Sequence, residues 1–200
     1  MEKRKEILIL GLGAIGSNVA KNLILADENL IINGIDKDRV EKRNLFTQVY
    51  RSRHVGQPKA VAFQMEIAEK TGMQPHGKFI LTELKKSGLD YFNRLDLIID
   101  CFDNWQSRIY AQEYAERMKC NILRLGFDFI NDKPLATSLW NHKPEDSNYK
   151  GKTIDVCDLQ EWSYWVAGVA GIFTGEVLNF IRRKSQRDLL IKNNFQIVEI

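Results

Sequence analysis

The sequence has little cysteine, and none of it is paired in a metal-binding or redox motif. Its 200 residues contain three cysteines, at 101, 120 and 157, with no C-x-x-C arrangement. An odd number without such a pair argues against a disulfide framework and against a structural zinc site. We therefore expect a reducing, cytoplasmic environment.

A strong charge of one sign is also lacking. The formal net charge is +3, and the lysines and arginines are spread along the chain. This excludes the concentrated basic surface of most nucleic-acid-binding proteins. We expect no nucleic-acid partner.

Long apolar runs and targeting signals are scarce. The longest apolar stretch, residues 162–181, contains Glu176 and Asn179, so we interpret it as a buried helix rather than a membrane span. Charged residues at 2–5 run directly into an apolar strand pattern, which is unlike a signal peptide. We expect no membrane association.

What is present is typical of a globular domain. Apolar residues make up 44% of the chain and charged residues 28%. We found no internal repeat and no low-complexity linker, so a single domain over residues 1–200 is expected.

Strand and helix patterns alternate along the first two-thirds of the chain, which predicts a doubly wound, mostly parallel Rossmann-like sheet. A hairpin at 128–140, a helix at 165–183 and an alternating segment at 195–200 predict antiparallel strands near the C-terminus. The other expected strands are 6–10, 30–35, 78–84, 95–100 and 121–125, and the helices are 17–26, 58–71 and 106–118.

A glycine-rich turn follows the first expected strand. Gly11, Gly13 and Gly16 form a G-x-G-x-x-G pattern between that strand and a helix, and Asp36 lies twenty residues after Gly16. Backbone N–H groups at such a helix start favour a phosphate, and an acid at this distance commonly binds a ribose hydroxyl. The pattern predicts an adenine nucleotide.

Polar residues collect where the expected parallel strands end. Asp36 and Asp38 end the second strand, and Asp100, Asp103 and Asn104 follow the strand at 95–100. Ligands of such sheets lie beyond the carboxyl ends of the strands, so we expect one crevice to hold these residues.

Five motifs in order resemble those of the ThiF/MoeB/HesA superfamily, the ubiquitin-activating-enzyme-like adenylyltransferases. They are G-x-G-x-x-G at 11–16, D-x-D at 36–38, N-L-x-x-Q at 44–48, G-x-x-K at 56–59 and D-x-x-D-N-x-x-x-R at 100–108. The resemblance runs from about residue 7 to residue 180.

This resemblance implies an enzyme that uses ATP and Mg²⁺ to adenylate the C-terminal carboxylate of a small ubiquitin-fold carrier protein, usually ending in Gly-Gly. It implies that Asp103 holds Mg²⁺, that Lys59 contacts the phosphates and that Asn44 binds ribose or phosphate. Cys157 would attack the acyl-adenylate and carry onward transfer. The resemblance also implies a homodimer.

Two positions depart from the family pattern. Ala14 replaces the second glycine of the family's G-x-G-G-x-G, a small change. Thr47 replaces the arginine of N-L-x-R-Q, which helps to neutralise the triphosphate; Arg43, Arg51 and Arg53 are candidates to replace it.

Plainer interpretations stay open for several residues. Asp103 and Asn104 both suit a helix N-cap, although the full motif favours a metal role for Asp103. Asp38 could support a loop, Lys59 could be a solvated helix residue, and Cys157 could be inert because acidic neighbours oppose thiolate formation. The alternatives for the whole chain are a non-catalytic partner or scaffold subunit and, ranked last, an NAD-dependent oxidoreductase.

Overall fold

The computed structural model describes residues 4–130, 133–143 and 160–200. In that part of the chain the elements are, in order, β1 (Lys5–Leu10), α1 (Ala14–Ala26), β2 (Leu30–Asp36), η1 (Lys42–Phe46), η2 (Ser52–His54), α2 (Lys59–Thr71), β3 (Phe79–Leu81), β4 (Leu97–Asp100), α3 (Trp105–Met118), β5 (Asn121–Ile130), β6 (Lys133–Trp140), η4 (Gln160–Trp162), α4 (Ser163–Arg183), β7 (Leu189–Ile191) and β8 (Ile197–Glu199).

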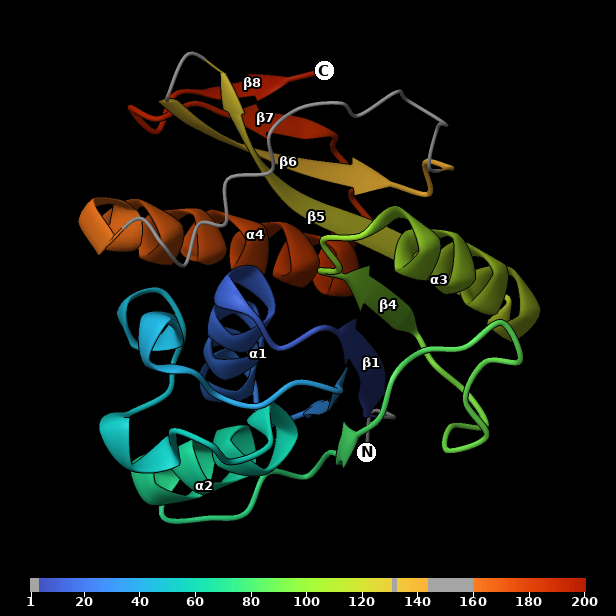
Figure 1. Cartoon of the computed structure of the whole chain (residues 1–200). Coiled ribbons are helices and arrows are strands. Elements are labelled where there is room, and N and C mark those ends of the chain that lie inside the picture. The colour runs from blue at the N-terminus through green and yellow to red at the C-terminus, as the bar shows by residue number, and fades with distance from the viewer. Residues whose placement is uncertain (1–3, 131–132, 144–159) are drawn as a thin grey trace.

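One mixed sheet organises the molecule (Figure 1). Its strand order is β3-β2-β1-β4-β5-β6-β7-β8. The first five of these strands pair in parallel, and β5 to β8 pair antiparallel. The predicted fold class, a mostly parallel sheet with antiparallel C-terminal strands, is confirmed.

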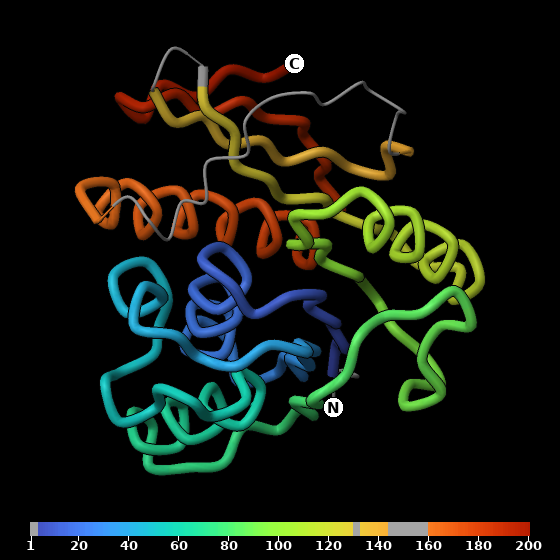
Figure 2. Tube along the Cα trace, viewed as in Figure 1, coloured from blue at the N-terminus to red at the C-terminus, as the bar shows by residue number. Residues whose placement is uncertain are grey.

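Helices cover both faces of this sheet. One core cluster packs side chains of α1, α2 and α4 against the sheet, and a second packs α3 and the segment 82–96 against the other face. Figure 2 shows that segment running alongside α3 before the chain enters β4. The strands are apolar on both faces because both are covered.

Local signals account for the ends of the helices. Pro58 immediately precedes α2, and Gly72 ends it in a left-handed conformation, with φ of 71°. Asn104 caps α3 by accepting the Ser107 N–H at 2.9 Å. The prediction was less accurate for α1, which begins at Ala14 rather than at Ser17.

Three strands differ most from expectation, and β4 and β8 each begin two residues later than expected. β3 is shorter than 78–84 because Leu84 turns away to pack in the second core cluster. β5 is longer than 121–125 because β6 pairs with it along its whole length. β7 was missed: three residues are too few to show a period, and only pairing with β6 makes them a strand.

The long apolar helix is part of the core. By length and composition alone, residues 160–183 could cross a membrane, but half of the most apolar window is buried within the fold. Trp165, Val169 and Phe173 of α4 are fully buried, and α4 packs along α1. This agrees with the interpretation as a buried helix.

Candidate nucleotide-binding site

The glycine turn lies at the point where the sheet topology reverses. β1 has β2 on one side and β4 on the other. Gly11 donates its N–H to the Ile35 carbonyl at 3.0 Å, and Cys101 donates to the Leu10 carbonyl at 2.9 Å, so the turn leaves β1 between the ends of both neighbours. Such a switch point is where ligands of open α/β sheets bind.

The three glycines serve different purposes. Gly11 has a φ of +90°, which favours glycine. A Cβ on Gly16 would lie 1.9 Å from the Gly11 carbonyl oxygen, so Gly16 lets α1 approach the turn. A Cβ on Gly13 would meet nothing within 4 Å, and Gly13 has an ordinary φ of −77°.

The N-terminus of α1 is therefore open beside Gly13. Among the described residues no side chain caps this helix, and Ala14, its first residue, is buried. The packing of the described residues does not require glycine at position 13; glycine suits the N-cap that it forms, and it also leaves room for a phosphate against the helix N-terminus. The turn fits the predicted nucleotide.

Asp36 fixes the turn. Its carboxylate accepts the Leu12 N–H at 2.7 Å with one oxygen and the Asp38 N–H at 2.8 Å with the other. Burial raises the pKa of Asp36, although the ammonium of Lys59 and both N–H groups oppose this shift. Asp36 lies where a ribose contact was predicted, and besides any such contact its oxygens hold two backbone N–H groups.

Asp38 and Lys59 form a pair that the sequence did not predict. The Lys59 ammonium lies 3.4 Å from the Asp38 carboxylate, and the Lys59 N–H donates to the Asp38 carbonyl at 2.9 Å. The lysine side chain is 10% exposed and the aspartate 57%. Lys59 is thus held beside Asp36 and is not a solvated surface lysine.

Asn44 is buried in η1, which docks on the start of α1. Its side-chain oxygen accepts the Glu41 N–H at 2.8 Å. Asn18 of α1 ties the two helices together, because its amide donates to the Ala14 and Thr47 carbonyls, each at 2.8 Å. The side chain of Asn44 shapes its own loop, and η1 is joined to α1 through Thr47.

The aspartates after β4 divide into a buried and an exposed one. Asp100 is fully buried, pairs with Arg124 at 2.9 Å and accepts the Phe102 N–H at 3.1 Å. Burial raises the pKa of Asp100, opposed by Arg108 and Arg124. Asp103 is exposed, and Asn104 serves as the cap of α3.

The donor set fits a magnesium ion held through phosphates. Within residues 4–130, 133–143 and 160–200, no three metal-ligating side chains gather. Mg²⁺ is commonly bound through one or two carboxylates together with substrate phosphates and water. Asp103 is exposed and follows β4 at the edge where the turn lies, and one of its oxygens accepts the Asn104 side-chain amide at 3.5 Å, whereas Asp36 and Asp100 are buried.

The arginines near Thr47 are engaged elsewhere. Thr47 is buried at the end of η1. Arg51 pairs with Glu66 of α2 at 2.6 Å, Arg53 pairs with Glu66 at 3.5 Å and with Glu69, and Arg43 pairs with Glu41 at 2.8 Å. These pairs argue against a simple replacement of the family's arginine by any of the three.

The surroundings of the two described cysteines disfavour the thiolate form. Burial raises the pKa of Cys101 far above its usual value, and it raises the pKa of Cys120 to about 11. Both are partly buried and pack against the two core clusters, Cys101 against the first and Cys120 against the second. Cys157 lies outside the described residues.

Sequence reasoning missed Tyr50. Its hydroxyl donates to the Leu12 carbonyl in the glycine turn at 2.8 Å, across 38 residues of sequence. It follows the N-L-x-x-Q motif closely, and that was the only available signal.

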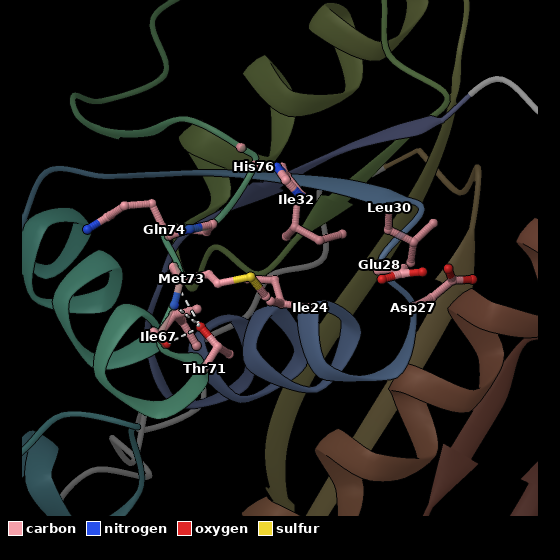
Figure 3. A pocket seen from close by; sticks show the side chains of 12 residues that line it. Ile24, Asp27, Glu28, Leu30, Ile32, Ile67, Thr71, Met73, Gln74 and His76 are labelled. Carbon is pink, nitrogen blue, oxygen red and sulfur yellow. Dashed lines mark hydrogen bonds between the residues drawn. The ribbon is translucent and has the colours of Figure 1, made fainter. Parts of the chain in front are cut away.

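A small apolar pocket of about 80 Å³ lies at the other end of the sheet. It is lined by the end of α1, the start of β2 and the end of α2, and Figure 3 shows Met73 extending toward Ile24 there. Strands begin at this end, so the pocket is remote from the turn.

A sequence profile described as the ThiF family matches residues 3–197. The chain belongs to the ThiF family. Among curated proteins, SUMO-activating enzyme subunit 2 of Dictyostelium discoideum is 32% identical over 111 residues, which are 52% of this chain and 16% of that protein. The adenylyltransferase and sulfurtransferase uba4 of Aspergillus niger is 32% identical over 115 residues, 55% of this chain and 23% of that protein.

Solved structures share the fold. E. coli MccB with ATP has a TM-score of 0.72 and 21% identity, covering 99% of this chain and 63% of that one. The PaaA crystal structure has a TM-score of 0.70 and 20% identity, covering 99% and 64%. This ThiF-family chain therefore spans less than a quarter of those two curated relatives and less than two-thirds of these solved chains.

Proposed function

We propose that this ThiF-family chain binds MgATP and adenylates the C-terminal carboxylate of a small ubiquitin-like protein, sulfur carrier or peptide. The observation that carries the proposal is the turn at 11–16, whose open helix N-terminus lies at the switch point beside Asp36, Lys59 and Asp103. The names of the relatives support the substrate class: one activates SUMO, and another is an adenylyltransferase.

In this reaction a carboxylate oxygen of the partner attacks the α-phosphorus of ATP. The bond from that phosphorus to the bridging oxygen breaks, and pyrophosphate leaves. Backbone N–H groups at the start of α1 hold phosphate, and Lys59 supplies a positive charge from a buried position. Asp103 would hold Mg²⁺, which offsets the negative charge of the phosphates.

The proposal extends to the remaining predicted features. Asn44 orients the nucleotide from η1, and Cys157 carries onward transfer of the activated carboxylate. The protein acts in the cytoplasm, and it acts as a homodimer. Sedimentation equilibrium tests the homodimer, because it measures the mass of the particle in solution.

A thermal-shift experiment tests nucleotide binding. MgATP at a hundred times its dissociation constant should stabilise the protein by roughly 2.7 kcal/mol. Asp103→Ala should abolish the metal-dependent part of the shift, and Asp90→Ala, at another exposed aspartate, should leave it intact. A shift with NADH but not with MgATP would instead indicate redox chemistry.

One observation favours a second candidate, a non-catalytic partner or scaffold subunit. Thr47 stands where the family has an arginine, and the nearby arginines pair with carboxylates. Isotope exchange between pyrophosphate and ATP, dependent on a carrier protein, separates the two. Exchange supports the enzyme, and ATP binding without exchange for any carrier supports the scaffold.

A further inference from the structure

We infer that Tyr50 is a positioning residue: its hydroxyl orients the Leu12–Gly13 peptide so that the Gly13 N–H faces the nucleotide phosphates. This inference rests on the proposed function. It concerns one contact of the glycine turn, between Tyr50 and Leu12, that the turn's own sequence does not reveal.

Tyr50 is held firmly. It is 4% exposed, and its ring belongs to the core cluster that includes α1 and α2. The preceding residues are tied to α1, because the Val49 N–H donates to the Ser17 hydroxyl at 3.4 Å and Asn18 donates to the Thr47 carbonyl. The backbone and ring of Tyr50 are therefore held in place, and its hydroxyl contacts Leu12 in a fixed position.

Both backbone polar groups of Leu12 are hydrogen-bonded to side chains. Asp36 accepts its N–H at 2.7 Å, and Tyr50 donates to its carbonyl at 2.8 Å. In a planar trans peptide the carbonyl and the following N–H point in opposite directions. The Gly13 N–H therefore points away from Tyr50.

These hydrogen bonds are needed because the glycine at position 13 would otherwise allow the Leu12–Gly13 peptide to flip. Gly13 has no side chain to restrict its φ, and a Cβ there would meet no neighbour. A flipped peptide would present the Leu12 carbonyl oxygen to the phosphates and repel them. The hydroxyl of Tyr50 holds the favourable orientation.

The hydroxyl stays a donor throughout the ordinary pH range. Burial raises the pKa of Tyr50 well above its usual value, and the nearby Asp36 carboxylate raises it further. Tyr50 donates one hydrogen bond at a fixed place and does not exchange a proton.

Tyr50→Phe removes this bond and keeps the ring. We expect ATP affinity to fall about tenfold. A tenfold change in affinity corresponds to a free energy close to the net contribution of one hydrogen bond. Adenosine, which has no phosphate, should bind with unchanged affinity. Titrations followed by thermal shift give both dissociation constants.

Tyr114→Phe is the matched control. Tyr114 is also buried, and its hydroxyl donates to the Leu89 carbonyl at 3.1 Å in the second core cluster. This variant should lose similar stability but bind ATP like the wild type. Equal ATP affinity of Tyr50→Phe and wild type, or an equal loss for ATP and adenosine, would overturn the inference.

A measurement on the wild type does not depend on the variant folding. In an NMR titration, ATP should move the Gly13 amide resonance and adenosine should not. A Gly13 amide that ATP leaves unmoved, in a protein that binds ATP, overturns the inference alone. A wild-type protein that binds no ATP overturns the proposed function, and the inference with it.

Discussion

At the scale of single residues, different glycines of the turn serve folding and ligand binding. Gly16 is required by packing, because a Cβ there would overlap the Gly11 carbonyl oxygen at 1.9 Å. Gly13 is required neither by packing nor by its backbone angles. One motif therefore combines a structural glycine with one that a ligand explains.

Substituting each by alanine should give opposite results. Gly16→Ala should destabilise the fold by about 3 kcal/mol, since the clash is with backbone. Gly13→Ala should cost no more than about 1 kcal/mol, the ordinary cost of alanine at a helix N-cap, but weaken ATP binding about tenfold because its methyl group intrudes where phosphate approaches. Urea unfolding and ATP titration measure the two effects. Unchanged ATP affinity in Gly13→Ala would contradict the proposed location of the phosphates.

The motif residues were predictable from sequence to different degrees. Positions at the strand ends placed Gly11, Asp36 and Asp103 at one edge of the sheet, and the family resemblance added Lys59. Spacing could not show that the Asp36 oxygens are occupied by backbone N–H groups or that Lys59 pairs with Asp38. Such contacts depend on how separate loops meet.

At the scale of elements, the β7–β8 turn is seated on α4. Phe195 lies in this turn with a φ of 62°, and its ring rests on Gly168; a Cβ on Gly168 would lie 2.4 Å from that ring. Gly171, one turn further along the same helix, has no described neighbour within 4 Å of a Cβ. The helix therefore provides a matched pair of glycines.

Gly168→Ala should displace the Phe195 ring and destabilise the protein by about 1–3 kcal/mol. Gly171→Ala should stabilise it by up to about 1 kcal/mol, because alanine has the higher helix propensity. Hydrogen exchange at β7 and β8, together with thermal unfolding, checks both. This packing would be contradicted if Gly171→Ala made hydrogen exchange in these strands faster. It would also be contradicted if Gly168→Ala left the exchange rate unchanged.

Asp96 links the starts of β1 and β4 and predicts a pH effect. It accepts the Glu6 N–H at 3.0 Å and pairs with Lys5 at 3.3 Å. Burial alone would raise its pKa, but the Glu6 N–H and Lys5 outweigh burial, so the pKa is lowered. A carboxyl group with a lowered folded pKa stabilises the fold above its usual pKa and loses this contribution as the pH falls through the folded pKa.

Asp96→Asn should therefore cost about 1 kcal/mol at pH 7, where the wild-type carboxylate is charged. The difference from wild type should shrink as the pH falls below about 4. Urea unfolding from pH 7 downward measures this difference in the free energy of unfolding. Asp90→Asn, at an exposed site, is the control. A difference that grows toward low pH would contradict the assignment.

At the scale of the whole molecule, one sheet runs from β3 to β8 without interruption. The two core clusters lie on its opposite faces and share the same strands. Unfolding one face would expose the other, because neighbouring residues of each strand point to opposite sides. A single cooperative domain over residues 1–200 therefore stays a prediction, and it can be tested by unfolding.

A single domain should unfold in one transition. The four tryptophans all lie between residues 105 and 165, whereas far-ultraviolet circular dichroism reports on the whole chain. Urea curves from the two signals should coincide. Separate midpoints would show that the N-terminal and C-terminal parts unfold independently.

The sequence by itself determined the strand–helix alternation, the parallel sheet and the residues at its ligand edge. These follow from local periodicity and from motif spacing, which a chain carries without reference to its fold. Only the tertiary structure decided which oxygens of Asp36 and Asp100 are occupied, where β3 ends, that β7 is a strand, and that Tyr50 reaches Leu12. Each of these depends on a contact between segments far apart in sequence, and no local pattern encodes such a contact.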